Sequence, residues 1–445
     1  MSLDLAGERF AVWGAARSGI AASNLLVELG ASVVLSDSRP LESIGREGLD
    51  ARVELRGGGN VVEGARWVVP SPGIPPSAPI FAQARALGVR LMSEIELAAR
   101  VCRAPIVAIT GTDGKSTTTE MVGALGRAAG LATEVAGNIG TPLSERVRAV
   151  GPDGLVVAEV SAFQLWSCGH FRPRVAIVTN VAPDHTDYFG GDHAAYIASK
   201  ARVLADLQAG DVAVLRGDDP VVAGFETAPG VHRVTFGPAA DFDFGWDGTH
   251  LLEGERRILP QSELGVVGRH NVLNALAALA AGRALGLSWA PMLEALRAFR
   301  GLPHRMEAVR VRGGVTWLDD SKATNPHAAV VGLRSLSGSY VAIVGGFDKG
   351  LDQSDFEAEL AARARAVVAV GPDGSTAART VRALEGRVAV YACASMDEAV
   401  ARADALAQPS DSVVLSPAAS SFDLYRDYHH RGQVYQAAVR ALPER

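Results

Sequence analysis

Residues 106–122 read "IVAITGTDGKSTTTEMV", and this stretch decides the fold class of the region around it. A run of β-branched apolar residues predicts a buried strand, and the segment after the glycines predicts a helix. Gly111 and Gly114 let the backbone approach phosphate oxygens, Lys115 can neutralise phosphate charge, and Ser116 can reach a magnesium ion. The stretch therefore predicts a phosphate-binding loop at the end of a strand.

The spacing of this loop differs from the common pattern G-x-x-x-x-G-K-[ST], because Ile109 stands at the position of the first glycine. On the residues alone, a damaged nucleotide site, a chance match and a distinct kind of loop all stay open. The bland alternative is a glycine turn followed by a solvated lysine. The strand before the loop and the helix after it favour phosphate binding.

The composition of the chain limits the classes of protein to which it can belong. Its 445 residues leave room for about three domains at roughly 150 residues each. A net charge of −6 gives no overall attraction to nucleic acid, so we expect no nucleic-acid partner. The three cysteines lie far apart and form neither a disulfide framework nor a zinc motif, which predicts a reduced, cytoplasmic protein.

Membrane insertion is not expected from the sequence. No apolar run reaches the roughly 18–20 residues that a membrane helix needs. The opening "MSLDLAGERF" carries acidic residues and no long apolar core, so it does not predict a signal peptide. We expect a monomer.

Three blocks follow one another along the chain, and we predict domains at residues 1–93, 94–300 and 301–445. Each block alternates short apolar strands with helical segments, an order that predicts parallel sheets with right-handed crossovers. The predicted fold class is α/β, with three domains in series. The N-terminal and C-terminal domains are Rossmann-like, and the central domain is P-loop-type with a parallel-rich sheet. Residues 211–265 read as more irregular.

Another glycine turn lies earlier in the chain, near the N-terminus. Gly14 and Gly19 follow the first predicted strand, Ala16 replaces the central glycine of a dinucleotide fingerprint, and Asp37 ends the next strand about 20 residues later. Asp37 can bond a ribose or a base. NAD-type binding, another phosphate ligand and simple packing all stay open on this motif.

Polar residues end two further strands of the central block. They are Glu159 after one strand and Asn180, Asp184, His185 and Asp187 after another. A carboxylate and an imidazole beside a phosphate loop can form a magnesium site, although histidine is an unusual ligand for so hard an ion. Taken singly, His185 reads as a structural histidine, Glu159 serves equally well as an ion-pair partner, and Lys200 reads as a solvated surface charge.

Nine separated motifs match one family in order and over nearly the whole chain. They are "TGTDGKSTTT" (110–119), "GNIG" (137–140), "EVSAFQL" (159–165), "NVAPDHTDYF" (180–189), "GRHNVLNALAAL" (268–279), "GLPHRME" (301–307), "DDSKATNPHAA" (319–329), "GGFDKG" (345–350) and "LSPAASSFDLY" (415–425). The chain thereby resembles the Mur ligases, the ATP-dependent amino-acid-adding enzymes of peptidoglycan synthesis. In that family the loop reads T-G-T-N-G-K-[ST], so the missing early glycine is normal. Within the family, "DDSKATNPHAA", "SPAASSFD" and "GAARSGIAAS" are most similar to the branch that adds D-glutamate.

The resemblance implies a cytoplasmic amide-forming ligase of cell-wall precursor synthesis, and hence of cell shape and division. ATP would phosphorylate the carboxylate of UDP-N-acetylmuramoyl-L-alanine, and the amine of D-glutamate would attack the acyl phosphate. Two magnesium ions and a carbamylated Lys200 are also implied.

The resemblance assigns roles to the matching positions. The implied catalytic residues are Lys115, Lys200 and His185. The implied ATP-binding residues are Gly111, Thr112, Asp113, Gly114, Lys115, Ser116, Thr117, Asn271, Arg305 and Asp320. The implied metal ligands are Ser116, Glu159, His185 and Lys200 as its carbamate. The implied UDP-substrate residues are Arg17, Ser18, Asp37, Arg39, Ser71, Pro72, Gly73, Asn138 and Ser161. The implied D-glutamate residues are Thr324, Lys349, Ser421 and Phe422, and Lys322 lies near either the γ-phosphate or the amino acid.

Three positions depart from the family pattern. Asp113 stands where asparagine is commoner, and an extra carboxylate near phosphate repels it unless the side chain points away or contacts the metal shell. Ala162 stands where a second serine is common, and Tyr188 where arginine is. Neither of the last two changes removes an implied metal ligand.

Three other functions share some of these sequence features. A folylpolyglutamate synthase shares the central loop but would bind a pteridine in place of UDP. An NAD-dependent oxidoreductase rests on the first glycine turn alone and leaves the central block unexplained. A nucleotide switch would use the phosphate loop without turnover.

Overall fold

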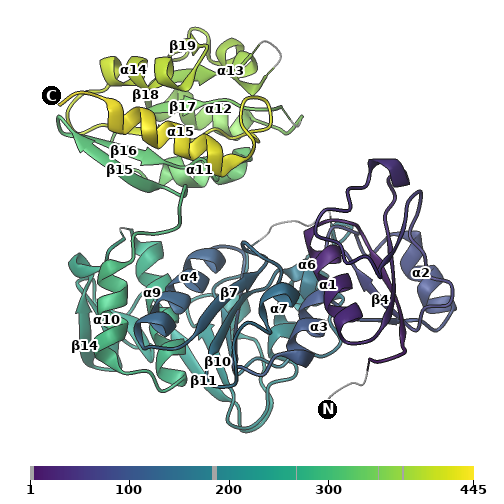
Figure 1. Ribbon diagram of the computed structural model, residues 1–445. Coiled ribbons are helices and arrows are strands. Elements are labelled where there is room, and N and C mark those ends of the chain that lie inside the picture. Colours follow the sequence, from purple (N-terminus) through teal and green to yellow (C-terminus); the bar gives the residue numbers. More distant parts are fainter. Residues whose placement is uncertain (1–4, 183–187, 267, 349, 373–374, 445) are drawn as a thin grey trace. The chain divides into compact units, whose positions relative to one another are not determined.

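The apolar runs of the sequence form strands that helices cover on both faces. In β6 (Ile106–Thr110) and β8 (Leu155–Glu159) every residue is buried, as parallel strands between two helical layers require. The computed structural model describes residues 5–182, 188–266, 268–348, 350–372 and 375–444. These residues form two compact units, one ending at Phe299 and the other beginning at Arg300 (Figure 1).

The first sheet has five parallel strands in the order β3-β2-β1-β4-β5. The strands are β1 (Arg9–Trp13), β2 (Ser32–Ser36), β3 (Glu54–Arg56), β4 (Trp67–Pro70) and β5 (Arg90–Leu91), and the helices are α1 (Arg17–Glu28), the 3-10 turn η1 (Leu41–Ser43), α2 (Pro79–Ala86) and α3 (Glu94–Val101). Helices α1 and α3 pack on one face and α2 on the other. The strand order reverses between β1 and β4, which is where ligands bind in open parallel sheets.

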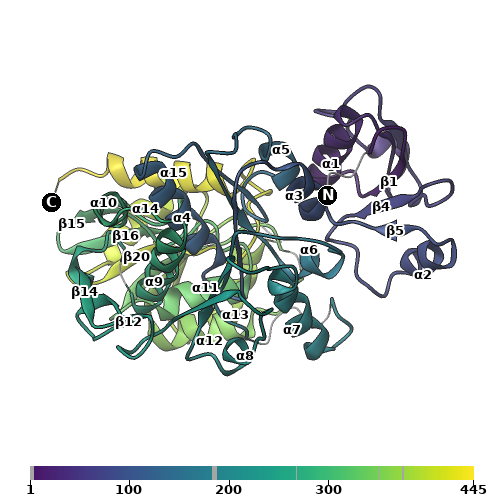
Figure 2. The same cartoon turned by 90° about the horizontal axis from the view of Figure 1, so that it is seen from below.

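The second sheet has nine strands in the order β14-β13-β12-β11-β10-β9-β6-β8-β7, and its antiparallel pairs are β12 with β13 and β13 with β14. Its other strands are β7 (Thr133–Gly137), β9 (Val175–Val178), β10 (Val212–Arg216), β11 (His232–Phe236), β12 (Phe244–Trp246), β13 (His250–Glu253) and β14 (Arg256–Pro260). Its helices are α4 (Lys115–Ala128), α5 (Leu143–Arg146), α6 (Ala162–Trp166), α7 (His193–Ala201), η2 (Arg202–Leu204), α8 (Pro220–Ala223), η3 (Gln261–Glu263), α9 (Arg269–Ala284) and α10 (Trp289–Ala298). Helices α4, α9 and α10 gather on one face (Figure 2).

The second unit contains a six-stranded sheet in the order β15-β16-β20-β17-β18-β19, with β15 antiparallel at one edge. Its strands are β15 (Glu307–Arg312), β16 (Val315–Asp319), β17 (Tyr340–Val344), β18 (Ala364–Val370), β19 (Ala389–Cys393) and β20 (Ser412–Leu415). Its helices are α11 (Pro326–Arg334), α12 (Ser354–Arg363), α13 (Thr376–Leu384), α14 (Met396–Leu406) and α15 (Tyr428–Ala441). Helices α14 and α15 cover one face and α11, α12 and α13 the other (Figure 1).

The predicted α/β class with parallel-rich sheets is confirmed, and one local expectation is wrong. Residues 211–265 are not irregular, because they form strands β10 to β14. The short antiparallel strands carry polar residues and turns that hide the period-two signal. The three-domain boundaries stay a prediction, since the first unit holds two of the three sheets.

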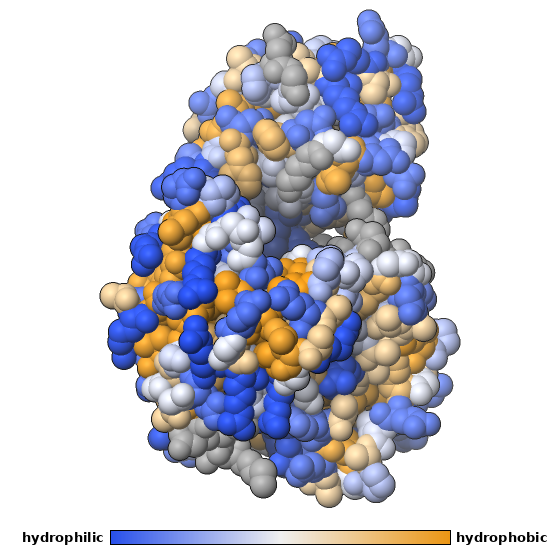
Figure 3. Space-filling view, turned by 90° about the vertical axis from the view of Figure 1, so that its right-hand side faces the viewer, coloured by the Kyte–Doolittle hydropathy of each residue, from blue (hydrophilic) through white to orange (hydrophobic). Residues whose placement is uncertain are grey.

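The surface drawn in Figure 3 mixes hydrophilic and hydrophobic residues, as surfaces of globular proteins do. Within the described ranges, no helix has both the length and the apolar character that would let it span a membrane.

Candidate active site

The phosphate-type loop joins β6 to α4 through two glycines in conformations that disfavour other residues. Gly111 has φ +149° and Gly114 has φ +78°. A Cβ atom on Gly111 would lie 1.9 Å from Thr179 Oγ1, and one on Gly114 would lie 2.4 Å from Asn274 Oδ1. The loop therefore requires glycine at both positions, for space as well as for backbone angle.

The side chain of Asn180, just after β9, fastens this loop. Its Oδ1 accepts the backbone N–H groups of Thr112 at 3.1 Å and Asp113 at 2.9 Å, and its Nδ2 donates to the Asp113 carbonyl at 3.1 Å. The same carbonyl accepts the Thr179 hydroxyl at 2.6 Å. These bonds involve only the backbone N–H and carbonyl of Asp113, and not its carboxylate. The residue is exposed.

Helix α4 brings the remaining predicted ATP residues to the loop. It begins at Lys115, whose Nζ donates to the Thr112 carbonyl at 2.7 Å, and Ser116 and Thr117 complete its first turn. Helix α9 contributes Asn274, whose Oδ1 accepts the Thr118 hydroxyl at 3.3 Å and whose Nδ2 donates to Asn271 Oδ1 at 3.2 Å. The structure thus brings the predicted residue Asn271 to the loop through Asn274.

Glu159 ends β8, the strand beside β6, and its carboxylate is buried with an exposure of 2%. Asn138 donates to it twice, from its backbone N–H to the Glu159 carbonyl at 2.8 Å and from Nδ2 to Oε1 at 2.8 Å. Oε2 has no hydrogen-bond partner among the residues that the structure describes. A buried carboxylate oxygen without a partner costs free energy, and an oxygen donor of this kind suits Mg²⁺. The residue therefore fits a metal ligand.

Lys200 on α7 is not a solvated surface charge, which corrects that interpretation. It is 2% exposed, and its Nζ donates to the Gly111 carbonyl at 2.5 Å. The ammonium also lies 4.5 Å from the centre of the Tyr196 ring, whose hydroxyl is 3.1 Å from Thr112 Oγ1. His185, Asp184 and Asp187 lie outside the described residues.

The N-terminal glycine turn is pinned by Asp37. Its Oδ2 accepts the Ala15 backbone N–H at 2.8 Å, and its Oδ1 accepts the backbone N–H of Arg39 at 3.0 Å and the guanidinium Nε at 2.9 Å. The hydrogen bonds from Arg39 hold the pKa of this carboxyl well below its usual range. Both oxygens are therefore engaged within the turn itself.

The other residues predicted for the UDP substrate lie around the ends of β1 and β4. Gly14 has φ +92°, and a Cβ on it would lie 2.7 Å from Ser71 Cβ, so the two strand-end loops touch. Arg17, at the start of α1, donates from Nη2 to the Gly140 carbonyl at 2.6 Å, which links this turn to the loop after β7. Ser18 is half-buried in α1, and Pro72 and Gly73 follow Ser71.

Ser161 also has a structural role, which the spacing Ser161-x-x-Gln164 could have indicated from the sequence. It is the N-cap of α6, where its hydroxyl accepts the Gln164 backbone N–H at 3.3 Å and the Gln164 side chain accepts the Ser161 backbone N–H at 3.0 Å. This reciprocal pair is a capping box, which fixes the start of the helix. The hydroxyl of Ser161 is therefore already bonded within the chain.

In the second unit, three strand-end loops meet at one buried guanidinium. Arg431 on α15 is 2% exposed. It donates to the Ser321 carbonyl at 2.9 Å, to the Ala419 carbonyl at 3.0 Å and to the Gly345 carbonyl at 3.5 Å. These carbonyls follow β16, β20 and β17. One side chain thus ties together the loops that hold the predicted D-glutamate residues.

Among those residues, Ser421 is buried, Thr324 is half-buried, and Phe422 is 71% exposed. Lys349 lies outside the described residues. Asp320, predicted for ATP, is buried, and its Oδ2 has no hydrogen-bond partner in the described ranges. Burial raises the pKa of Asp320 to about 8, against the opposing charge of the exposed Arg305.

Several residues of these sites were not singled out from the sequence. Asn274 lies one helical turn after Asn271, and Tyr196 lies one turn before Lys200, so helical spacing could have indicated both. Arg431 carried no such signal, because its partners are backbone carbonyls of distant loops.

The fold and this geometry place the protein among the α/β proteins that carry a phosphate-type loop at a strand end. The Mur ligase middle domain matches residues 109–282, and the Mur ligase, glutamate ligase domain matches residues 304–419. The chain belongs to the Mur ligase family.

Relatives and solved structures agree with this assignment. The UDP-N-acetylmuramoylalanine--D-glutamate ligase of Pelotomaculum thermopropionicum is 40% identical over 99% of both chains. The enzyme of the same name from Salinibacter ruber is 40% identical over 98% of both. The structure of UDP-N-acetylmuramate-alanine ligase from Thermotoga maritima aligns with a TM-score of 0.60 at 18% identity, covering 98% of this chain and 99% of that one. That likeness concerns the fold.

Proposed function

We propose that the chain is an ATP-dependent ligase that joins D-glutamate to UDP-N-acetylmuramoyl-L-alanine through an acyl phosphate. The relatives that are about 40% identical over nearly the full chain carry the name of this activity. The observation that carries the proposal for the site is the meeting of three groups. They are the phosphate loop after β6, buried Glu159 at the end of the neighbouring strand β8, and buried Lys200 on α7, which donates to the loop.

The phosphate loop is proposed to bind the ATP phosphates. The first turn of α4 offers backbone N–H groups and the positive end of the helix dipole to an anion. Lys115 lies at the start of that helix, where a cation can offset the repulsion between the γ-phosphate and a substrate carboxylate. Asn271 is proposed to contact the adenine, and Arg305 and Asp320 to contact phosphate and ribose.

Magnesium is proposed to bind Ser116, Glu159, His185 and a carbamylated Lys200. Carbamylation would turn the buried cation into an anion with two oxygen donors, which suits a hard metal ion better than an ammonium does. When bound, magnesium supplies charge neutralisation to the phosphates. The fit rests on Glu159 Oε2, which lacks a partner in the described part of the chain.

The other two substrates are proposed to bind at separate strand ends. The uridine diphosphate would lie where the strand order of the first sheet reverses, near Arg17, Ser18, Asp37, Arg39 and the loop 71–73. Asn138 and Ser161 would reach the muramoyl part. D-glutamate would contact Thr324, Lys349, Ser421 and Phe422, with Lys322 nearby. We also propose that the enzyme acts in the cytoplasm as a monomer.

The test is ADP release from purified protein with ATP, Mg²⁺ and UDP-N-acetylmuramoyl-L-alanine, against amino acids in both chiral forms. The expected result is turnover with D-glutamate alone. Turnover with a different amino acid would leave the ATP site standing and remove the assignments of Thr324, Lys349, Ser421 and Phe422. If no amino acid stimulates turnover, the UDP-linked substrate is wrong, and a folate-type ligase becomes the candidate.

A further inference from the structure

The turn before β15 holds two residues in an unusual backbone conformation. His304 has φ +60° and Met306 has φ +47°, both in the left-handed region that residues other than glycine enter only at a cost in free energy. Arg305, between them, is exposed. Such strain persists only where the surrounding structure overdetermines it, and it collects at functional sites. The contacts of this turn therefore identify what holds Arg305 in place.

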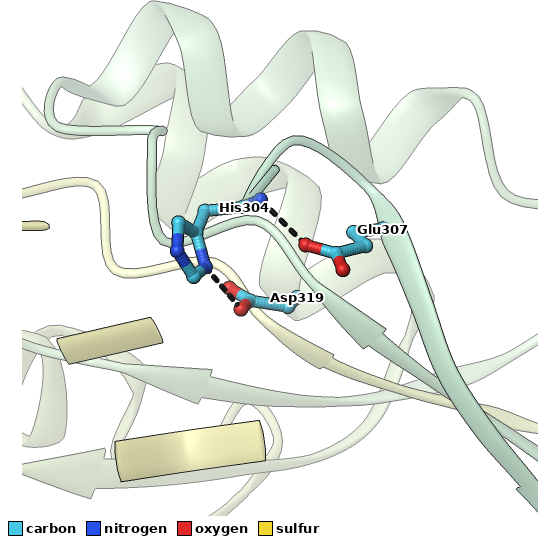
Figure 4. Close-up of side chains that lie close together, drawn as sticks. All are labelled: His304, Glu307 and Asp319. Atoms are coloured by element: carbon cyan, nitrogen blue, oxygen red, sulfur yellow. Dashed lines mark hydrogen bonds and ion pairs between the residues drawn. The ribbon is translucent and has the colours of Figure 1, made fainter. Parts of the chain in front are cut away.

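Four side chains form a network beside the turn, in which Glu307 is half-buried and the other three side chains are buried. His304 Nδ1 lies 2.7 Å from Asp319 Oδ2, and the His304 backbone N–H donates to Glu307 Oε2 at 2.8 Å (Figure 4). Gln436 on α15 joins the two carboxylates, because its Nε2 donates to Asp319 Oδ2 at 2.9 Å and to Glu307 Oε2 at 3.0 Å. Both amide protons of Gln436 are therefore used, one on each carboxylate.

A glycine in α15 lets this helix come close enough for Gln436 to reach the two carboxylates. Gly432, one turn earlier on the same face, lies so close to the turn that a Cβ on it would be 2.1 Å from His304 Nδ1 and 2.8 Å from Asp319 Oδ2. Only glycine allows the helix to approach the ring in this way. The approach that Gly432 permits places the Gln436 amide between the two carboxylates.

The polar groups of this network bond to one another, although their spacing would also suit a cation. The ligand atoms of His304, Glu307 and Asp319 all lie within 4.8 Å of one another, as a cation site would require. The Gln436 amide, however, already supplies protons to both carboxylates. The hydrogen bond with Asp319 raises the pKa of His304, with the charge of Glu307 adding to it. The network is complete without a metal ion.

We propose that Gln436 and Glu307 are positioning residues, which act through His304 to hold Arg305 in the orientation that contacts the nucleotide. The inference rests on the proposed nucleotide role of Arg305. Helix α15 (Tyr428–Ala441) would thereby help to position Arg305, although none of the family motifs lies in this helix. The backbone of Lys322 ties the same turn to the loop after β16, because its N–H donates to the His304 carbonyl at 2.9 Å.

The test is a double-mutant cycle read as affinity for a fluorescent ADP analogue, without the other substrates. The variants are Q436M, R305A and the double variant, with Q433M as the matched control, since Gln433 is an exposed glutamine on the same helix. Q436M is expected to weaken binding about 10-fold in the otherwise native protein and less than about 2-fold in the R305A background, since residues of one network couple. Q433M is expected to change nothing.

Equal weakening by Q436M in both backgrounds, or no weakening, would overturn the proposal. If Q436M does not fold, E307Q replaces it in the same cycle, because it keeps the shape and an acceptor for the His304 N–H while removing the charge. Because the readout needs only the nucleotide, a wild-type protein that binds ADP but shows no turnover with D-glutamate would count against the proposed function and leave this inference intact.

Discussion

The two glycine turns of the first unit share one local structure and differ in how their polar groups are satisfied. Residues 14–19 and residues 111–114 each lead from a buried parallel strand into a helix. In the first turn the charged carboxylate of Asp37 is bonded by Ala15 and Arg39. In the second turn the neutral amide of Asn180 does the corresponding work.

The two turns therefore differ in which polar groups are already hydrogen-bonded, although both join a buried strand to a helix. In the first turn both oxygens of the Asp37 carboxylate accept hydrogen bonds from the turn, and the guanidinium of Arg39 balances its charge. The second turn is fastened by Asn180 and Thr179, while the ammonium groups of Lys115 and Lys200 donate to its carbonyls. A carboxylate oxygen of Glu159 beside it has no hydrogen-bond partner in the described residues. The first arrangement suits recognition of a substrate, and the second suits reaction at phosphate.

The largest effect is expected from Lys200, the buried lysine of α7 whose ammonium group donates to the Gly111 carbonyl of the second turn. K200A should lower turnover by about 1,000-fold, because it removes a charged group that contacts the loop. Acetate or formate should restore part of the activity by replacing the proposed carbamate, and K200R should stay inactive because an arginine forms no carbamate. Full activity of K200A would remove Lys200 from the mechanism.

The proposed carbamate can also be observed directly. Lysine occurs at only four positions, Lys115, Lys200, Lys322 and Lys349. A ¹³C NMR signal from protein equilibrated with ¹³CO₂ can therefore be assigned by single lysine-to-arginine variants. We expect K200R alone to abolish it.

Glu159 should separate activity from stability. E159Q should lower turnover by about 100-fold, because it removes the proposed metal ligand while keeping the acceptor for Asn138. The free energy of unfolding should not fall, since the lost oxygen has no partner in the described ranges. Chemical denaturation and steady-state kinetics measure the two. If E159Q were destabilised but fully active, Glu159 would have a structural role and would not be a metal ligand.

Replacing Gly111 or Gly14 by alanine should raise the KM of a different substrate in each case. G111A forces a Cβ against Thr179, so it should raise the KM for ATP about 10-fold or more, and G14A forces one against Ser71, so it should raise the KM for the UDP substrate. G130A is the matched control, because Gly130 has φ +84° with nothing within 4 Å of the added atom. If both variants raised the KM of both substrates equally, the two turns would not bind different substrates.

The smallest effect is expected from Asp37. D37N should lower the free energy of unfolding by about 1 kcal/mol at neutral pH, because it weakens charge-assisted hydrogen bonds. The folded-state pKa of Asp37 lies below its unfolded value, so its contribution is present above about pH 4 and is lost as the pH falls further. The difference between D37N and wild type should therefore shrink in acid. A difference that persists there would contradict the assigned role.

Local sequence patterns predicted the strands and helices that flank the loops. They did not predict hydrogen bonds between a side chain and a residue far away in the sequence. The strand, glycines and lysine of residues 106–122 predicted β6, the loop and α4, because those interactions are local. Lys200 read as a surface charge because its partner, the Gly111 carbonyl, is 89 residues away in the chain. Arg431 and Gln436 bond to groups on other elements of the second unit, so no spacing in the sequence could reveal them.

The oxygen atoms of the substrate carboxylate report most directly on whether an acyl phosphate forms. UDP-N-acetylmuramoyl-L-alanine labelled with ¹⁸O in its terminal carboxylate is incubated with ATP, Mg²⁺ and D-glutamate, and the released phosphate is examined by mass spectrometry. If the γ-phosphate is transferred to the carboxylate and then displaced by the amine, the phosphate carries one labelled oxygen. Unlabelled phosphate, or label in AMP, would contradict an acyl phosphate formed at the second turn.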